Sequence, residues 1–235
     1  DFSGSIAGVQ LYNNALTATE VKELYSGASV PFKYKGAISN MFDAGADVFT
    51  SGTYSWVAYG SNGLANVSID GNPTLAITRN DTNDGAYLYL KGDTDLTTDC
   101  IIGKRYRLRY QIKYAGGSAP AVPRVVAGSG NEVDSTDAVT TSLAYSTIDF
   151  TPTITNPYFH VRASTSNVIT IDNLSLIQLG AVAEYDGSGV TNDKWYDKSG
   201  NQLHGTVSGA TDENTAGAPW ISANHPAFQV QLATM

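Results

Sequence analysis

The sequence predicts an all-β protein whose main body is an antiparallel β-sandwich. Ser, Thr, Asn and Gly make up 84 of the 235 residues, and Asp outnumbers Glu by 17 to 5. These residues favour turns and strands, whereas helix-forming Glu is scarce. Charged residues are 15% of the chain, below the roughly 25% of an average soluble domain. Short strand signals also follow one another between turns, without intervening helices, which is typical of a sandwich.

The N-terminal part, 1–36, is expected to hold one strand and one short helix before a linker. Apolar residues alternate over the first eleven residues, which indicates a strand. Thr17 and Glu20 then form a T-x-x-E capping box ahead of apolar residues at helical spacing. We therefore expect a helix at 18–26 and a linker at 28–36.

The central part, 37–179, carries strand signals spaced at roughly 8–15 residues. Turns rich in Gly and Asn separate the strands, at 61–63, 70–73, 80–85, 116–117 and 128–130. The expected strands are 64–70, 74–79, 86–91, 104–114, 121–127, 145–151, 157–163 and 168–177.

The C-terminal part, 180–235, has fewer alternating runs and more turn dipeptides, such as Asp186-Gly187 and Ser199-Gly200. Two interpretations fit this composition. The part is either a small loop-rich β segment or a piece that orders only against another chain.

The charge balance argues against several classes of partner. The chain has 14 basic and 22 acidic residues, a net charge of −8 and a pI of about 4.7. Nucleic acids and anionic membranes both attract basic surfaces, so neither is expected as the main partner. No apolar run approaches the roughly 20 residues that span a bilayer, so membrane insertion is not expected.

Two further features bound the biological setting. The chain begins at Asp1, without Met and without a signal segment, so we expect it to be part of a longer protein. Cys100 is the sole cysteine, which excludes an internal disulfide framework and a cysteine-based zinc site. We expect Cys100 to be a small buried side chain.

One expected strand, 104–114, separates two kinds of side chain by parity. Tyr and aliphatic residues occupy the even positions and are assigned to the core. Polar residues occupy the odd positions: Arg105, Arg107, Arg109, Gln111 and Lys113. This polar row is either a solvated sheet face with Asp partners or the polar half of a sugar-binding cleft.

Outward aromatic residues supply the other half of a candidate sugar site. In 86–91, Tyr87 and Tyr89 alternate with core leucines, and in 157–163 the outward set is Tyr158, His160 and Arg162. Aromatic rings stack on the apolar faces of sugars, whereas flat polar groups bond the hydroxyls. Trp56 is either a stacking residue with one wet face or part of the core.

Nothing in the sequence indicates catalysis. A glycosidase needs two carboxylic acids facing each other across a sugar, and the five Glu residues lie in the expected helix, a loop and the C-terminal part. Serine-hydrolase, zinc-protease and phosphate-loop motifs are missing from the sequence. We expect a protein that is not an enzyme.

Several segments in order resemble carbohydrate-binding modules of families 4, 9 and 22. They are Asn40-Met-Phe-Asp43, Trp56 in a Tyr-Ser-Trp run, Gly103-Lys-Arg-Tyr106, Tyr145 to Thr151, and Ile169-Thr-Ile-Asp172-Asn-Leu-Ser-Leu176. The resemblance covers about 140 residues and implies a jelly-roll fold and a non-catalytic module that binds an oligosaccharide or polysaccharide. It also implies a structural Ca²⁺ held by Asp43 and Asp172 with backbone carbonyls, because hard oxygen ligands suit that ion.

The flanking parts resemble fragments of LamG/concanavalin-like domains. Residues 2–25 resemble the closing strand and helix of such domains, and the run from Trp195 to Val207 resembles strands near their start. A sugar module between two such fragments resembles a phage tail fibre or another modular receptor-binding protein, which implies an extracellular or virion location.

The sequence therefore supports a glycan-binding module that attaches a modular extracellular protein or a phage tail fibre to surface carbohydrate. Two alternatives stay open. One is a structural spacer or trimerisation segment of a fibre, in contact with other copies of the chain and without sugar binding. The other is an accessory module of a polysaccharide-degrading enzyme.

Overall fold

The fold was established from a computed structural model, which describes residues 6, 8–25, 35–79, 85–164, 167–186, 190–191 and 193–208. The chain divides into two compact units. The larger is Ser39–Leu179, and the smaller combines Asp1–Ile38 with Gly180–Met235. The expected linker over 28–34 and the last part of the C-terminal segment lie outside the described residues.

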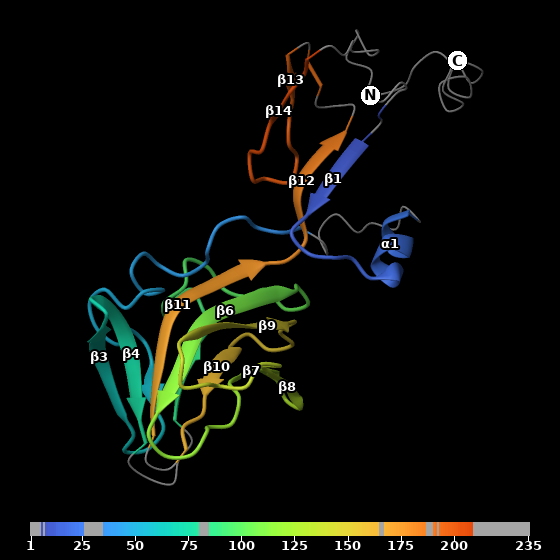
Figure 1. The fold of residues 1–235 in the computed structure, drawn as a ribbon. Coiled ribbons are helices and arrows are strands. Elements are labelled where there is room, and N and C mark those ends of the chain that lie inside the picture. Colours follow the sequence, from blue (N-terminus) through green and yellow to red (C-terminus); the bar gives the residue numbers. More distant parts are fainter. Residues whose placement is uncertain are drawn as a thin grey trace, which may run out of the picture. The chain divides into compact units, whose positions relative to one another are not determined.

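The larger unit is an antiparallel β-sandwich of two five-stranded sheets, which confirms the predicted fold class. The first sheet has the order β2-β5-β10-β7-β8, and its strands β10, β7 and β8 are labelled in Figure 1. Its strands are β2 (Val57–Ala58), β5 (Ala86–Tyr89), β10 (Tyr158–Val161), β7 (Arg124–Gly128) and β8 (Asn131–Asp134).

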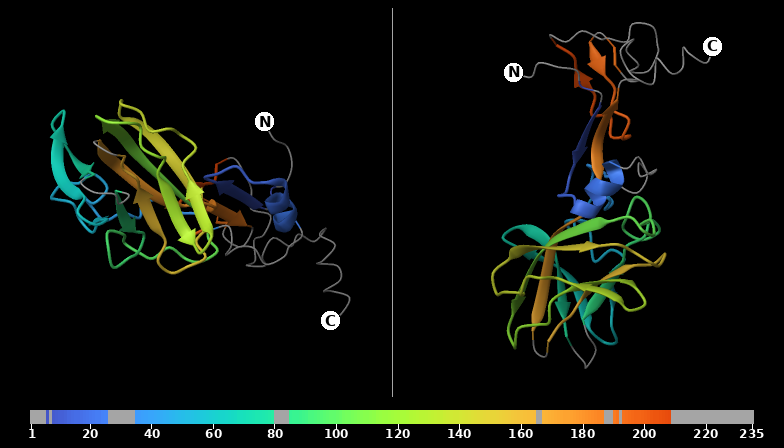
Figure 2. Two further views of the ribbon diagram at one scale, coloured as in Figure 1. Left: turned by 90° about the horizontal axis from the view of Figure 1, so that it is seen from below. Right: turned by 90° about the vertical axis from the view of Figure 1, so that its right-hand side faces the viewer.

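The second sheet has the order β3-β4-β11-β6-β9, and its strands lie side by side in Figure 1 and Figure 2. They are β3 (Gly63–Ile69), β4 (Asn72–Thr78), β11 (Val168–Gln178), β6 (Tyr106–Ala115) and β9 (Ala144–Phe150). β11 runs along β6 with a register shift between Asp172 and Ser175. Strands far apart in the sequence are therefore neighbours in both sheets.

The core lies between the two sheets. Tyr110 of β6 and Phe159 of β10 are fully buried, and their ring centroids lie 4.8 Å apart. Trp56 and the same Phe159 ring form a T-shaped pair with centroids 5.7 Å apart. Burying side chains of this size stabilises a fold by about 1.5–3 kcal/mol each. These aromatic contacts join the inner faces of the sheets.

Alternation along the strands leaves each sheet with an outer face on the opposite side from the core. In β6 the even-numbered side chains from Tyr106 to Ile112 are buried, Tyr114 is partly buried, and the odd-numbered ones are at least partly exposed, which follows the predicted alternation. β5 and β10 alternate in the same way. Because the inner faces meet, the two outer faces point in opposite directions.

Two short strands of the larger unit were not predicted, β2 and β8. β2 has two residues, too few for an alternating pattern, and β8 carries Glu132 and Asp134 on its exposed side. Both are edge strands of the first sheet. Short and charged edges are a common protection against pairing with other chains.

The smaller unit contains β1 (Gly8–Tyr12), α1 (Ala18–Tyr25), β12 (Ala181–Asp186), β13 (Lys194–Trp195) and β14 (Gly205–Thr206). The expected capping box is formed, because Thr17 N–H donates to Glu20 Oε2 at 2.6 Å and Glu20 N–H donates to Thr17 Oγ1 at 3.3 Å. β1 pairs with β12 in antiparallel register. The two segments that flank the sandwich in the sequence thus join within one chain.

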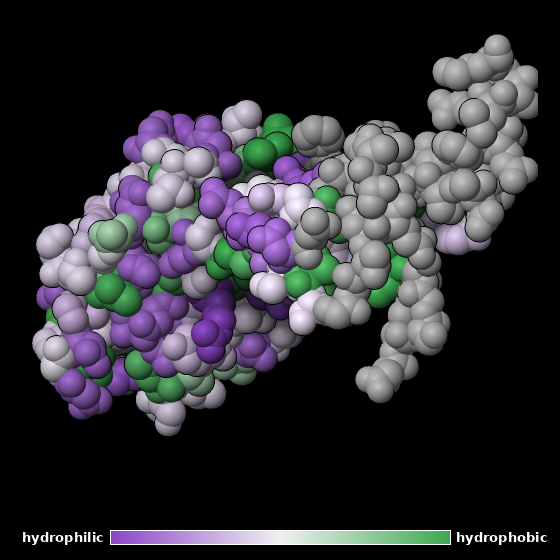
Figure 3. Space-filling model, turned by 90° about the horizontal axis from the view of Figure 1, so that it is seen from above, coloured by the Kyte–Doolittle hydropathy of each residue, from purple (hydrophilic) through white to green (hydrophobic). Residues whose placement is uncertain are grey.

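Two observations concern larger partners. No helix among the described residues is long and apolar enough to cross a membrane. On the face of the molecule drawn in Figure 3, apolar residues lie as separate spots among polar ones. The described part of that face therefore lacks the broad apolar area that marks many protein–protein interfaces.

Removing the ring at the centre of the core should unfold the sandwich readily. Phe159→Ala is expected to lower the free energy of unfolding by about 3–5 kcal/mol, measured from the urea-unfolding midpoint. Phe159→Leu, which keeps most of the volume, should cost much less. A small effect of the alanine variant would contradict the placement of this ring at the sandwich centre.

Candidate functional site

Aromatic side chains gather on the outer face of the β2-β5-β10-β7-β8 sheet. Tyr87 and Tyr89 come from β5, and Tyr158 and His160 come from β10. The antiparallel register sets Tyr158 opposite Tyr89 and His160 opposite Tyr87. The ring centroid of Tyr158 lies 5.6 Å from that of Tyr87 and 5.9 Å from that of Tyr89. The sheet therefore assembles residues that the sequence analysis singled out in two separate strands. We call the group of Tyr59, Tyr87, Tyr89, Tyr158 and His160 the tyrosine face.

Tyr59 belongs to this group and was missed by sequence reasoning. It follows β2, and its ring centroid lies 4.8 Å from that of Tyr87 and 5.0 Å from that of His160. The N–H of Tyr59 donates to the carbonyl of Gly85 at 3.0 Å, which holds the segment beside β5. A strand of two residues offers no periodicity, so only its place after Trp56 in an aromatic run could have drawn attention to it.

Two phenols of the tyrosine face, Tyr59 and Tyr87, have a raised pKa. Burial, the neighbouring Tyr158 and a hydrogen bond with it raise the pKa of Tyr59 to about 12. Burial and the adjacent Tyr89 likewise raise the pKa of Tyr87. Neutral phenols both donate and accept hydrogen bonds. The tyrosine face therefore presents aromatic rings together with hydroxyls that can donate or accept hydrogen bonds.

Ion pairs border the tyrosine face at β7 and β8. Arg124 lies opposite His160 in the register. Its guanidinium donates to Asp134 Oδ1 at 3.0 Å and also bonds Glu132. Arg162 donates two hydrogen bonds to the carbonyl of Val122, at 3.2 and 3.0 Å. Its guanidinium therefore has a structural role, and the N–H groups that make these bonds are not available to a ligand.

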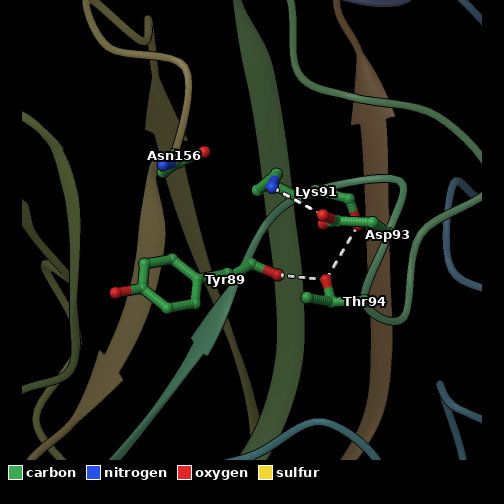
Figure 4. Close-up of a pocket in the computed structure, with 5 residues that line it drawn as sticks. All are labelled: Tyr89, Lys91, Asp93, Thr94 and Asn156. Atoms are coloured by element: carbon green, nitrogen blue, oxygen red, sulfur yellow. Dashed lines mark hydrogen bonds and ion pairs between the residues drawn. The ribbon is translucent and has the colours of Figure 1, made fainter.

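A hollow of about 330 Å³ opens beside Tyr89 (Figure 4). Lys91 forms an ion pair with Asp93 at 2.7 Å in its lining, and the Thr94 hydroxyl lies 2.8 Å from both the Tyr89 and Lys91 carbonyl oxygens. Asn156 completes the lining from the loop before β10. Figure 4 shows the Tyr89 ring extending along one side of the hollow. The tyrosine face thus continues into a polar recess.

Trp56 does not join this surface. Its side chain is only 5% exposed and lies in the core against Phe159. Its indole N–H is buried and has no hydrogen-bond partner among the described residues. A ring enclosed on this scale cannot stack on a ligand, so the core interpretation of Trp56 holds and the stacking one does not.

Arg107, Arg109 and Gln111 are also not part of the tyrosine face. They lie on β6, on the outer face of the other sheet. Since the two outer faces point away from each other, these side chains cannot line one cleft with Tyr87 and His160. Parity along a strand identifies an outward side chain but not the sheet to which its strand belongs.

The two acids expected to hold Ca²⁺ each have another acid as neighbour. Asp172 is buried, and burial together with nearby Asp47 raises its pKa. Its carboxylate accepts bonds from the N–H and the amide of Asn173, at 2.8 and 3.2 Å. Asp43 lies near Asp95, whose pKa burial also raises. Among the described residues no group of three or more His, Cys, Asp or Glu is placed to hold a metal, and a site of fewer acids with carbonyls stays a prediction.

Comparisons with known proteins give structural neighbours only. No protein-family model and no curated protein matches the sequence. A CBM22 xylan-binding domain of Paenibacillus barcinonensis is similar at 17% identity and a TM-score of 0.47, over 61% of this chain and 99% of that one. A family 22 carbohydrate-binding module of Clostridium thermocellum gives 20% identity and a TM-score of 0.41, over 60% and 96%. A cellulose-binding domain of Cellulomonas fimi gives 18% and 0.34, over 52% and 87%.

Alkaline titration tests the electrostatics of the tyrosine face. The raised pKa of Tyr59 means that its neutral form contributes stability that is fully present below the ordinary value of 10.0 and is lost as the pH rises towards 12. The absorbance difference between the wild-type chain and Tyr59→Phe should report one phenol that ionises late. A difference curve centred at the ordinary value would contradict the packing described for this ring.

Proposed function

We propose that this chain is a non-catalytic glycan-binding module whose tyrosine face binds neutral polysaccharide. The observation that carries the proposal is the gathering of Tyr59, Tyr87, Tyr89, Tyr158 and His160 on one outer sheet face. Their side chains are half-buried and not enclosed. Partly exposed rings with hydroxyls match the two surfaces of a sugar, its apolar C–H face and its hydroxyl edge.

The geometry of the rings favours a single polysaccharide chain over a flat crystalline surface. Neighbouring tyrosine rings are inclined to one another by 50–81°. A planar surface needs coplanar rings, whereas a separate chain can follow an uneven one. The hollow beside Tyr89 extends this uneven surface beyond the last ring.

The charges around the tyrosine face favour a neutral ligand. The cations at its border each have an acidic partner: Lys91 has Asp93, and both Arg124 and Arg162 have Asp134. Glu132 adds a second acid to Arg124. A charged sugar would have to compete with these ion pairs, whereas neutral hydroxyls can bond to them as they stand.

The same pairing supports a binding role over hydrolysis. A glycosidase holds one carboxylic acid protonated and a second carboxylate across the bond to be cut. The acids bordering the face among the described residues, Asp93, Glu132 and Asp134, are each committed to a cation. No pair of carboxyls is thus presented to a bound sugar there.

The proposed setting is attachment of a larger extracellular protein, such as a phage tail fibre, to surface carbohydrate. Single sites of this kind bind with roughly millimolar to micromolar constants, about −4 to −8 kcal/mol. Several copies on one particle would raise the effective affinity by about 10²–10⁴. An accessory module of a polysaccharide-degrading enzyme would use the same face in another setting.

The proposal includes a structural Ca²⁺ held by Asp43 and Asp172. Oxygen ligands of this kind suit that ion. Asp172 is buried and has no cationic partner among the described residues, so a bound cation would be stabilising. Chelation should therefore lower the unfolding temperature of the wild-type chain but not that of Asp172→Asn. Equal unfolding temperatures of the wild-type chain with and without Ca²⁺ would contradict the proposed ion site.

Binding to neutral polysaccharides tests the main proposal. Tyr89→Ala and His160→Ala should each weaken binding to soluble xylan or cellulose fragments by about tenfold, as expected for an aromatic contact near the centre of an interface. Calorimetry on the full chain measures the constants. Tyr145→Ala is the matched control, because it removes an exposed tyrosine from the opposite face.

A panel of neutral glycans that gives no binding would contradict the proposal and favour the structural spacer. Solution mass then separates the remaining alternatives, because a trimerisation segment must form trimers at working concentrations. Equal loss of affinity in Tyr145→Ala would likewise contradict the location of the site.

A further inference from the structure

We propose that the outer face of the β3-β4-β11-β6-β9 sheet is a second binding site, for an acidic polysaccharide, centred on Arg109 and Tyr145. This site is independent of the tyrosine face, because it lies on the other side of the sandwich. It is argued from stacking, from charge and from the orientation of one amide.

The first observation is a guanidinium that lies over an aromatic ring. The Cζ atom of Arg109 lies 3.4 Å from the centroid of the Tyr145 ring. Arg109 is exposed, and Tyr145 is 47% exposed. Stacking on an aromatic ring restricts the guanidinium to a plane and leaves its N–H edge in solvent. Arg109 is therefore preorganised to bind a carboxylate or a sulfate through two parallel hydrogen bonds.

The second observation is the charge of this face. Its cations are Arg105, Arg107, Arg109 and Lys113 on or beside β6. Arg107 donates to both Asp149 oxygens, at 2.7 and 2.8 Å, and Arg105 reaches the same carboxylate at 3.2 Å. Among the described residues, no carboxylate lies within ion-pair distance of Arg109 or Lys113. In a chain of net charge −8, this face keeps unmatched positive charge.

A further acid, Asp172, lies on the same face as this row but is enclosed. Asp172 is opposite Gln111 in the register but is only 5% exposed, with Asp47 beside it. Its carboxylate already accepts two bonds from Asn173. Asp172 is therefore enclosed, whereas Arg109 is exposed and Lys113 is partly exposed.

The third observation is the orientation of Gln111. The amide of Asn173 donates to Gln111 Oε1 at 2.5 Å. With its oxygen occupied in this way, Gln111 offers its NH₂ group as a donor to solvent. Gln111 lies opposite Tyr145 in the β6–β9 register and two residues from Arg109. Donors thus follow one another along the strand, as binding of a polyanion requires.

The length of the row indicates a polymer as the ligand. Outward side chains from Arg105 to Lys113 extend over eight residue steps, about 27 Å at the rise of a β-strand. A single small anion would occupy only one position on such a row. An acidic polysaccharide presents charges at repeated intervals and can engage Arg109 and Lys113 together. The single exposed ring and the acidic chain argue against nucleic acid.

Binding of the full chain to defined polyanions tests this second site. Polygalacturonate supplies carboxylates and dextran sulfate supplies sulfates, with neutral xylan and single-stranded DNA as comparators. The wild-type chain should bind one or both acidic polysaccharides, more weakly as salt is raised. Binding confined to one of them would identify the anionic group.

Variants separate a built site from diffuse charge. Arg109→Ala and Tyr145→Ala should each lower affinity for the acidic polysaccharide on the order of tenfold, as for a charge-assisted contact. Arg109→Lys keeps the charge but lacks the planar fork, so it should also bind more weakly. Lys22→Ala removes one exposed positive charge from α1 in the other unit and should bind as wild type. Tyr89→Ala should also keep the wild-type affinity for the acidic polysaccharide.

Four results would overturn the second site. They are absence of binding to both acidic polysaccharides, tighter binding to DNA than to either, full affinity in Arg109→Lys, and an equal loss in Lys22→Ala. Circular dichroism of each variant checks that folding is retained, as expected because Arg109 and Tyr145 are on the surface. The neutral-glycan affinity of Arg109→Ala should be unchanged, so failure of this site and of the tyrosine face can be told apart.

Discussion

The contact between Tyr110 and Phe159 across the sandwich fixes the chemistry of both surfaces. Each ring is fully buried, and their centroids lie 4.8 Å apart. Side chains alternate along a strand, so placing these two rings inward places their chain neighbours outward. A shift of one residue in either strand would exchange the core and surface sets. Packing at the centre thus determines that Arg109 faces one side and His160 the other.

The two outer faces carry different balances of charge. On the tyrosine face, cations are paired with acids and the rings are inclined to one another, which is the basis for proposing a ligand that presents hydroxyls and C–H faces. On the opposite face, Arg109 lies on the Tyr145 ring with its charge unmatched. One sandwich can therefore carry two sites, because each face has its own set of residues at odd or even positions.

The sequence was sufficient to predict features that depend on neighbouring residues. Alternation in β6 and β10 correctly assigned the core, and the T-x-x-E pattern correctly placed the start of α1. Alternation cannot tell which strands become neighbours, since pairing depends on contacts distant in sequence. For that reason Arg107 and Tyr87 were assigned to one site although they lie in different sheets.

Three residues show where local patterns end. Tyr59 follows a strand of two residues, so no period marked it. Trp56 carried two interpretations until the packing on Phe159 decided between them. Tyr145 was noted in the sequence only as the start of a family-like segment, and the structure sets its ring under Arg109. The role of each residue depends on a contact that the local sequence pattern does not reveal.

The most direct test of the tyrosine face is an NMR titration of the isotope-labelled full chain with a neutral xylan oligosaccharide. The account predicts that amide signals of Ala86–Tyr89 and Tyr158–Val161 shift, while those of β6 and β9 stay in place. Shifts confined to β6 and β9, or none at saturating sugar, would contradict it.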